Sequence, residues 1–412
     1  MDDNRYQCFD YADKKIIIDL KNKTCAGIDK KRFNDSILRE SDNALKKVLN
    51  NKVDYEENCI NTVYLLITRK CNLNCSFCCV RADVKKNNRA SEVSIHKIYE
   101  SIIPLLEKLN PRKLIITGGE PLMNTELVSI LKAIKDCLPN IYITLQSNGF
   151  LIEKYDKIAE LSKEINHIEI SSSHYKNLLQ LEKIINILKI HKVDVVLSYT
   201  TDGDISEIKK ILDFVVAMRI GFMLNFIAPL GGAVDNDLKI LDFEERIAIF
   251  KQIAEYILGK KYFGYRFLDL FRQQIRIRTS CNALGKMIAI QPDGTCHICH
   301  SLCDKKFMIG NCKTDSIDTL LNNWNKKISE KEIIEMMDVD SKEPCKTCKL
   351  RYLCGGTCAA YMNNHKLKIE LCKLQHFLIA YNLLIDNMEA SEEENLFAFV
   401  SLCDEKDKVL NL

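Results

Sequence analysis

The sequence lacks both a strong charge imbalance and any long apolar run. Its 59 Lys and Arg residues nearly balance its 56 Asp and Glu residues, which leaves a formal net charge of +3. So small a charge gives no general basis for binding nucleic acid or an anionic membrane surface. No apolar run reaches the roughly 18 residues that a membrane-spanning helix needs. Because Met1 is followed by a polar, acidic stretch, we expect no secretory signal and a cytoplasmic protein.

Cysteine is unusually frequent in this sequence. The chain has 412 residues, enough for two or more domains, and its 47% hydrophobic and 28% charged residues are typical of globular proteins. It also has 19 cysteines. In an oxidising compartment so many cysteines would predict disulfides, whereas in a reducing one they predict metal ligands.

Three of these cysteines are concentrated in one short segment. Cys71, Cys75 and Cys78 have the spacing C-x3-C-x2-C and follow the run 62–68, whose β-branched and aromatic residues predict a buried strand. Three thiols on one loop can face a single inorganic centre but cannot all pair as disulfides. A four-iron cluster held by three thiolates keeps one iron free of protein ligands, which suits it for catalysis. Zinc or scattered buried cysteines are the alternatives.

This spacing resembles the signature of the radical S-adenosylmethionine (SAM) superfamily, in which Phe77 matches the aromatic residue before the third cysteine. The resemblance implies that the open iron chelates SAM. It also implies that an electron splits SAM to give a 5'-deoxyadenosyl radical. A flavodoxin- or ferredoxin-type protein would supply that electron.

Strands and helices are predicted to alternate after residue 60, which indicates an α/β fold with a parallel sheet. Six such units fit the partial (β/α)6 TIM barrel of the radical SAM core. Strands are expected at 62–68, 113–117, 141–146, 167–171, 193–200 and 221–227, and helices at 91–109, 123–137, 152–162, 176–190, 205–218 and 243–258. Ser91 and Ser94 supply the expected start of the first helix. The expected domains are a small cap or peptide-docking module at 1–60, the barrel at 61–275, a cysteine-rich domain at 276–375 and a helical tail at 376–412. The first module is expected to have strands at 15–20 and 24–28 and a helix at 41–49, and the tail an acidic turn at 392–394.

Motifs at the ends of these strands match the SAM-binding segments of the resemblance. Gly118, Gly119 and Glu120 follow the second expected strand, where two glycines let the backbone approach a ligand closely. Chemistry in parallel barrels gathers at the carboxyl ends of the strands. The resemblance therefore implies cofactor contacts also from the next two strand ends, at Ser147, Asn148 and Ser171. Ser173 replaces the acid that related sequences commonly carry after the fourth strand.

A second group of cysteines resembles the seven-cysteine SPASM domain, which carries two auxiliary [4Fe–4S] clusters in related proteins. The resemblance implies an outer cluster on Cys345, Cys348, Cys354 and Cys372, and an inner cluster on Cys281, Cys299 and Cys358. The fourth ligand of the inner cluster is open: it is Cys303, Cys312 or Cys296, or the site is free for substrate. Two zinc sites are the alternative for this domain.

Three functions follow from the resemblance. The leading one is a peptide maturase that abstracts hydrogen from a ribosomally made precursor and forms a thioether or carbon–carbon crosslink. The second is a sulfatase-type maturase that makes formylglycine, in which an Asp proposed as the base stands at the position of His300. The third is a non-catalytic iron–sulfur electron carrier or scaffold, but such a protein would not need a SAM-binding loop. Neither the cysteine spacings nor the other motifs identify a catalytic side chain.

Overall fold

The computed structural model describes residues 6–31, 60–82, 92–272, 276–281, 283–361, 365–386 and 389–410. The chain divides into two compact units. The first comprises Met1–Glu57, Asp242–Cys281 and Ile334–Leu412, and the second comprises Asn58–Leu241 and Asn282–Ile333. Within the described ranges, no helix is both long and apolar enough to cross a membrane.

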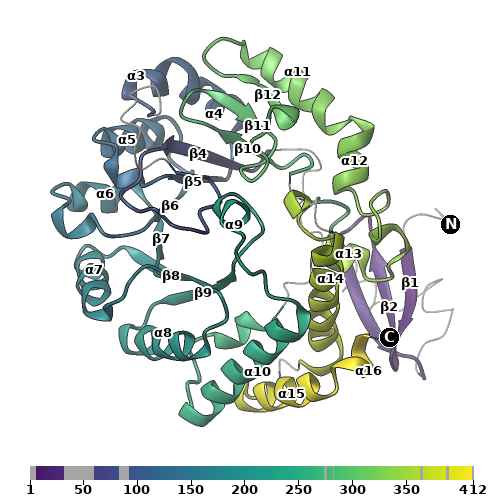
Figure 1. The fold of residues 1–412 in the computed structure, drawn as a ribbon. Helices are drawn as coiled ribbons and strands as arrows, with labels where there is room; N and C mark the ends of the chain where they lie inside the picture. The colour runs from purple at the N-terminus through teal and green to yellow at the C-terminus, as the bar shows by residue number, and fades with distance from the viewer. Residues whose placement is uncertain are drawn as a thin grey trace. The chain divides into compact units, whose positions relative to one another are not determined.

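A curved sheet is the framework of the second unit. Six of its strands run parallel in chain order, and the helices that connect them cover its outer side (Figure 1). This arrangement confirms the predicted α/β fold. The parallel strands are β4 (Thr62–Thr68), β5 (Lys113–Gly118), β6 (Tyr142–Ser147), β7 (His167–Ser171), β8 (Asp194–Thr201) and β9 (Gly221–Phe226). The helices are α3 (Ile95–Lys97), α4 (Ile103–Leu109), α5 (Leu127–Cys137), α6 (Ile158–Glu164), α7 (Leu178–Ile190), α8 (Ile205–Met218) and α9 (Gly232–Asp235).

Helix starts follow the local sequence signals. The side chain of Ser94 accepts the N–H of Lys97 at the start of α3, as the sequence predicts. Asp204 accepts two backbone N–H groups at the start of α8. Ser91, the other expected helix start in this region, lies outside the described residues. Because every strand of this series points the same way, the loops after β4, β5, β6 and β7 meet at one edge of the sheet.

Three further strands extend this sheet beyond β4. They are β10 (Met287–Ile290), β11 (Thr295–His297) and β12 (Met308–Asn311), and the sheet has nine strands in the order β12-β11-β10-β4-β5-β6-β7-β8-β9. β10 pairs in parallel with β4, whereas β10, β11 and β12 pair antiparallel. The first part of the predicted cysteine-rich domain therefore belongs to the barrel sheet, because β4 offers it a row of backbone hydrogen-bonding groups. Helix α11 (Ile317–Ile328) follows, and α12 (Lys331–Met337) comes next.

The first unit combines a small sheet with helices from two distant parts of the chain. Its antiparallel sheet contains β1 (Tyr6–Tyr11), β2 (Lys14–Asp19) and β3 (Thr24–Asp29), of which the sequence analysis predicted the last two. The helix predicted at 41–49 lies outside the described residues. The helices are α10 (Phe243–Lys260), α13 (Arg351–Cys354), α14 (His365–Ala380), α15 (Glu392–Asp404) and α16 (Lys406–Leu410).

Two features of this unit differ from the expectation. Helix α10, expected to complete the sixth βα unit of the barrel, belongs instead to the first unit, where it packs on α14 and α15. Glu392–Glu394, expected as an acidic turn, form the first turn of α15. Ser391 and Glu394 form a capping box there, and acidic side chains are favourable at the positive end of the helix dipole.

An aromatic cluster forms the core where these helices meet. Phe399 is fully buried, and its ring centroid lies 4.4 Å from that of Phe271, 5.0 Å from that of Tyr381 and 5.9 Å from that of Phe377. The pairs with Tyr381 and Phe377 are edge-to-face, an arrangement that adds stabilisation beyond the area that the rings bury. The cluster joins segments more than 100 positions apart in the chain.

We expect Phe399→Ala to destabilise the first unit by about 3–5 kcal/mol, because it leaves a cavity among packed rings. The measurement is thermal or denaturant unfolding. Phe397→Ala is the matched control, since Phe397 lies on the same helix and is 59% exposed. An equal effect of the two substitutions would contradict the packing described here.

Candidate active site

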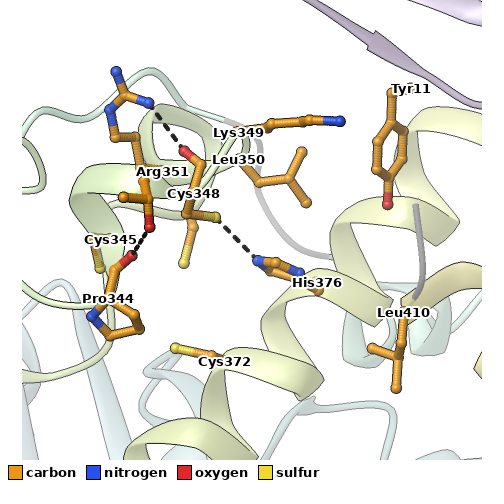
Figure 2. A pocket seen from close by; sticks show the side chains of 12 residues that line it. Tyr11, Pro344, Cys345, Cys348, Lys349, Leu350, Arg351, Cys372, His376 and Leu410 are labelled. Atoms are coloured by element: carbon orange, nitrogen blue, oxygen red, sulfur yellow. Dashed lines mark hydrogen bonds between the residues drawn. The ribbon is translucent and has the colours of Figure 1, made fainter.

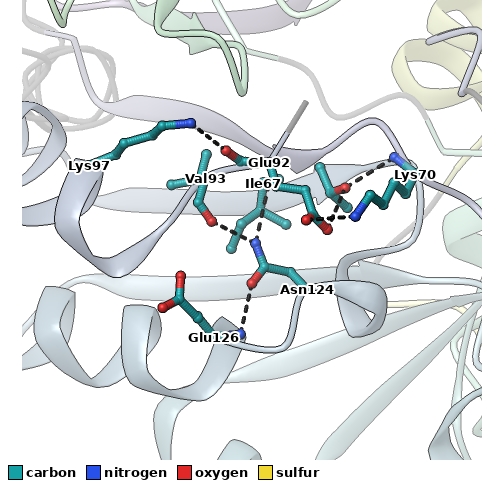
Figure 3. Close-up of polar contacts among 8 residues, drawn as sticks. Ile67, Lys70, Glu92, Val93, Lys97, Asn124 and Glu126 are labelled. Carbon is teal, nitrogen blue, oxygen red and sulfur yellow. Dashed lines mark hydrogen bonds and ion pairs between the residues drawn. The ribbon is translucent and has the colours of Figure 1, made fainter. Parts of the chain in front are cut away.

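Polar contacts hold the strand end that leads into the cysteine loop. Asn124 Nδ2 donates to the carbonyl oxygen of Val93 at 2.8 Å. Lys70 Nζ pairs with Glu92 Oε2 at 2.8 Å, and the Lys70 N–H donates to Thr68 Oγ1 at 3.1 Å (Figure 3). These bonds fix the backbone immediately before the first cysteine of the loop.

The three thiols of this loop lie within electrostatic reach of one another. Burial raises the pKa of Cys75 to about 11, and the neighbouring Cys78 and Cys71 add to the rise. Burial also raises the pKa of Cys71. Thiols in such a setting ionise when a bound metal takes up their charge.

This donor set fits an iron–sulfur cluster. Across the described ranges, no group of three or more His, Cys, Asp or Glu side chains is arranged to hold a single metal ion. In a four-iron cluster, by contrast, each thiolate binds its own iron, so the thiols stand at separate corners. Soft thiolate ligands are the donors that such clusters take.

The loop after β5 approaches the cysteine loop backbone to backbone. The Gly119 N–H donates to the carbonyl of Thr68 at 2.7 Å, and the Glu120 N–H donates to the carbonyl of Lys70 at 2.8 Å. A Cβ atom on Gly119 would lie 2.1 Å from the Lys70 carbonyl oxygen, and one on Gly118 would lie 2.3 Å from that of Thr68. Only glycine permits this approach, so the two predicted glycines are needed to join the loops.

Glu120 connects three loops through a fully buried carboxylate. Its Oε1 accepts hydrogen bonds from the Leu122 N–H at 3.0 Å and the Ser147 hydroxyl at 2.8 Å, and its Oε2 accepts the Asn148 N–H at 2.8 Å. The Asn148 side chain donates to Asn72 Oδ1 at 2.8 Å. Burial raises the pKa of Glu120, and its hydrogen bonds oppose the rise. The carboxylate therefore braces the three loops.

The end of β7 contributes serines to the same edge of the sheet. Ser171 is half-buried and faces Ser198 in the register of β7 and β8. Ser173 Oγ accepts the backbone N–H of Thr200 at 2.7 Å. Ser173, which replaces the acid of related sequences, thus anchors the loop to β8.

His174 reaches the cysteine loop from this anchored segment. Its Nε2 lies 3.3 Å from Cys75 Sγ. Its ring stacks on that of Phe77, with centroids 5.2 Å apart and planes inclined by 9°. Phe77 therefore contacts a histidine that the pattern of cysteines did not identify as a site residue. No spacing rule would have found it, because the two residues are 97 positions apart.

Helix α9 closes over the other side of the loop. The Gly232 N–H donates to the carbonyl of Cys78 at 2.8 Å. The guanidinium of Arg81 binds both carboxylate oxygens of Asp235, at 2.5 and 2.8 Å. The cysteine loop is thus attached to the segment after β9 as well as to the loop after β5.

The four cysteines predicted for the outer cluster line one cavity of about 270 Å³ in the first unit (Figure 2). Cys345 and Cys348 flank a short turn, Cys354 ends α13, and Cys372 lies on α14. Burial raises the pKa of Cys354 to about 12, and the other three thiols add to the rise. Burial likewise raises the pKa of Cys372 to about 11, with Cys345 and Cys348 contributing. The four thiols that the sequence predicted for one cluster thus line a common cavity.

Basic side chains act on two of these cysteines. Burial raises the pKa of Cys345, and the positive charges of Lys342 and Lys368 oppose the rise. The Lys342 ammonium group is buried and donates to a backbone carbonyl. His376 Nε2 lies 3.2 Å from Cys348 Sγ. A histidine one helical turn after Cys372 was visible in the sequence, but only the fold directs it at a thiol.

The cysteines predicted for the inner cluster belong to different units. Cys281 and Cys358 lie in the first unit. Burial raises the pKa of Cys358, and the nearby Cys281 adds to the rise. Cys299 lies in the second unit. The inner cluster therefore stays a prediction from the sequence.

The three candidates for its fourth ligand have other contacts in the second unit. Cys303 Sγ accepts a hydrogen bond from the Gln291 side chain at 3.0 Å, and Gln291 in turn accepts one from Arg69 at 2.7 Å. Cys296 and Cys312 hydrogen-bond to each other, which lowers the pKa of Cys312 and raises that of Cys296. The choice among the candidates stays open.

A row of polar side chains crosses β6 and β7 on the face opposite the fully buried Ile168 and Ile170. Glu169 accepts a hydrogen bond from Gln146 at 2.8 Å and lies 3.3 Å from His167 Nε2. Burial alone would raise the pKa of Glu169, but these two partners outweigh it and lower the pKa. The sheet therefore presents a charged carboxylate that the sequence analysis did not single out, although period-two alternation places it beside His167.

Comparison with known families agrees with this geometry. Residues 65–199 match the model of the radical SAM superfamily, and residues 281–349 match that of SPASM, an iron–sulfur cluster-binding domain. The chain therefore contains a radical SAM domain and a SPASM domain. The predicted resemblance is confirmed, and this radical SAM chain is an enzyme with a SPASM domain whose cofactors are SAM and iron–sulfur clusters.

Two groups of solved structures share the radical SAM and SPASM architecture. SuiB of Streptococcus suis, bound to S-adenosylmethionine, has a TM-score of 0.54 and 15% identity, over 89% of this chain and 97% of SuiB. The enzyme anSMEcpe with bound AdoMet has a TM-score of 0.58 and 17% identity, over 85% of this chain and 98% of that one. At such identities the likeness concerns the fold.

Relatives found by sequence align with a smaller share of this chain than these structures do. An uncharacterized protein of Archaeoglobus fulgidus is 23% identical over 331 residues, 73% of this chain and 74% of that protein. A probable GTP 3',8-cyclase of Methanococcus maripaludis is 29% identical over 215 residues, 51% of this chain and 64% of the cyclase. The match to the cyclase thus spans less than two thirds of its length.

We expect Gly119→Ala to lower SAM affinity at least about tenfold, which is about 1.4 kcal/mol, because the added methyl group displaces the Lys70 carbonyl and the loop. Equilibrium binding of SAM to the reconstituted enzyme measures it. Gly259→Ala is the matched control, since a Cβ atom there would meet nothing within 4 Å. Unchanged SAM affinity in Gly119→Ala would show that the loop contact is dispensable for binding.

Proposed function

We propose that this radical SAM enzyme is a peptide maturase that forms a thioether or carbon–carbon crosslink in a ribosomally made precursor. When bound, SAM supplies by reductive cleavage the 5'-deoxyadenosyl radical that removes a hydrogen atom from the peptide. A flavodoxin- or ferredoxin-type protein is the proposed electron donor. The cytoplasmic location remains a prediction from the sequence.

The observation that carries this proposal is the likeness of almost the whole chain to enzymes crystallised with peptides. SuiB has been solved bound to its precursor peptide SuiA, and that structure covers 88% of this chain. The enzyme anSMEcpe has been solved with AdoMet and the Kp18Cys peptide, and it covers 85% of this chain. The likeness thus extends over far more of the chain than the cysteine loop and its SAM-binding edge.

The proposed cofactor contacts follow the braced edge of the second unit. Cys71, Cys75 and Cys78 hold the SAM cluster, and the backbone of Gly118 and Gly119 meets the methionyl part of SAM. Further contacts come from the loops next to it, from Phe77, Glu120, Ser147, Asn148 and Ser171. The SPASM cysteines hold two auxiliary clusters, so that three clusters form in all.

The formylglycine alternative has less support. His300 stands where that reaction uses an Asp, and its ring stacks on Tyr64 with centroids 3.9 Å apart. Burial lowers the pKa of His300 to about 4, which is far below the pKa of a base suited to neutral pH. A non-catalytic iron–sulfur protein, the other alternative, would not need the close approach of Gly119 to the cysteine loop.

We expect Cys75→Ala to abolish formation of 5'-deoxyadenosine while leaving the auxiliary clusters assembled, because its thiol belongs to the SAM cluster alone. The assay incubates anaerobically reconstituted protein with SAM and dithionite and quantifies 5'-deoxyadenosine. Cys137→Ala is the control, since Cys137 is exposed at the end of α5. Normal production by Cys75→Ala would remove the cluster assignment.

We expect the reconstituted protein to bind about 12 irons, four for each of three clusters. Iron and sulfide analysis after anaerobic reconstitution measures the number. Cys354→Ala should lose one cluster and keep the other two. Zinc retained at Cys345, Cys348, Cys354 and Cys372 would contradict the auxiliary-cluster assignment.

Peptide modification itself is tested with synthetic peptides that correspond to short reading frames beside the gene. A mass loss of about 2 Da, two hydrogen atoms, without formation of an aldehyde indicates a crosslink, because oxidation of serine to formylglycine loses the same mass but gives an aldehyde. A change of a cysteine or serine to an aldehyde would instead favour formylglycine formation.

A further inference from the structure

Two histidines, one in each unit, stand in the same relation to a cluster cysteine. His174 Nε2 lies 3.3 Å from Cys75 Sγ in the second unit. His376 Nε2 lies 3.2 Å from Cys348 Sγ in the first unit (Figure 2). These are hydrogen-bond distances for a nitrogen and a sulfur atom, and the contacts join residues 99 and 28 positions apart in the sequence.

We propose that His174 and His376 each donate an Nε2–H hydrogen bond to a cluster-bound cysteine sulfur and thereby raise the reduction potential of that cluster. The inference rests on the cysteine assignments of the proposed function. It assigns to both histidines a positioning and tuning role that acts through the sulfur atoms.

The direction of each hydrogen bond follows from the chemistry of the sulfur. A thiol can donate or accept, but a cysteine bound to iron has lost its proton and can only accept. Once the cluster is bound, the contact persists only if the imidazole nitrogen carries the hydrogen. The sulfur thus selects the tautomer with hydrogen on Nε2, as partners of metal-ligating groups commonly do.

The effect on the cluster follows from charge. Reduction adds one electron to the cluster, and part of the added charge resides on the cysteine sulfurs. A hydrogen bond to sulfur stabilises the reduced state more than the oxidised state, so it raises the reduction potential. The bond of His174 would therefore ease electron transfer from a protein donor to the SAM cluster.

Both rings are held in place by groups other than the cysteines. His174 stacks nearly parallel on Phe77. Its loop is anchored through the bond between Ser173 and Thr200. His376 is fixed by its position on α14, inside the same cavity as the four outer cysteines. A ring fixed in this way meets the sulfur at low entropic cost, which favours a lasting bond.

The test is a redox titration of the reconstituted enzyme followed by electron paramagnetic resonance. The SAM cluster is recognised by the change in its signal when SAM is added. His174→Phe retains the stacking on Phe77 and removes only the hydrogen-bond donor. We expect it to shift the midpoint of the SAM cluster to a more negative potential and to leave the auxiliary clusters unchanged. His376→Phe should likewise shift a midpoint to a more negative potential, but that of an auxiliary cluster, and should leave the SAM cluster unchanged.

Conservative variants separate tuning from structure. Gln can donate an N–H, so His174→Gln and His376→Gln should restore part of each shift. Full iron content with unchanged midpoints in the Phe variants would overturn the proposal. Loss of iron would also overturn it, because it would make the histidine a ligand or a structural residue.

If the variants do not fold, a measurement on the unaltered enzyme tests the proposal instead. With 15N-histidine incorporated, pulsed electron paramagnetic resonance should detect a weakly coupled 15N nucleus at the reduced SAM cluster, and an exchangeable proton in deuterium oxide. Absence of both couplings would overturn the proposal. The cysteine assignments are judged separately, by the iron content and by the response of the cluster signal to SAM.

Discussion

The backbone contact between the loop after β5 and the start of the cysteine loop is the constraint on which the site depends. Two hydrogen bonds make it, from Gly119 to Thr68 and from Glu120 to Lys70. Their short approach requires residues without side chains at positions 118 and 119. Next to this contact, the Glu120 carboxylate accepts hydrogen bonds from Ser147 and Asn148 and so links the loop after β5 to the end of β6. The edge at which we propose that SAM binds is therefore a set of loops joined by main-chain groups and by the Glu120 carboxylate.

Electrostatics explains why the cysteine sites need iron to become negatively charged. Burial and neighbouring thiols raise the pKa values of Cys75 in the cysteine loop and of Cys354 and Cys372 at the cavity of the first unit. Without metal, these three sulfur atoms therefore keep their protons at neutral pH. In the proposed clusters iron would replace those protons, and the positive charges of the buried Lys342 and its neighbour Lys368 would compensate part of the charge at Cys345.

Local patterns were enough to predict most of the barrel. The strand at Thr62–Thr68 and the helix at Ile205–Met218 were predicted with the bounds that the structure has. Their apolar periodicity and capping residues are properties of neighbouring positions. The strand Tyr6–Tyr11 was missed because its sequence does not alternate between apolar and polar residues: Cys8 and Phe9 are adjacent. Pairing with β2 makes this segment a strand.

The sequence by itself determined the chemical class of this protein: the cysteine spacings, the paired glycines and the alternation of strands and helices led to a SAM and iron–sulfur enzyme. Each of these signals is local, because ligands on one loop must follow one another at fixed intervals. The tertiary structure decided which distant side chains meet them. Only the fold brings His174 to Cys75 and His376 to Cys348, and only it adds β10 to the edge of β4. Contacts of this kind depend on how strands and helices pack, which no spacing along the chain records.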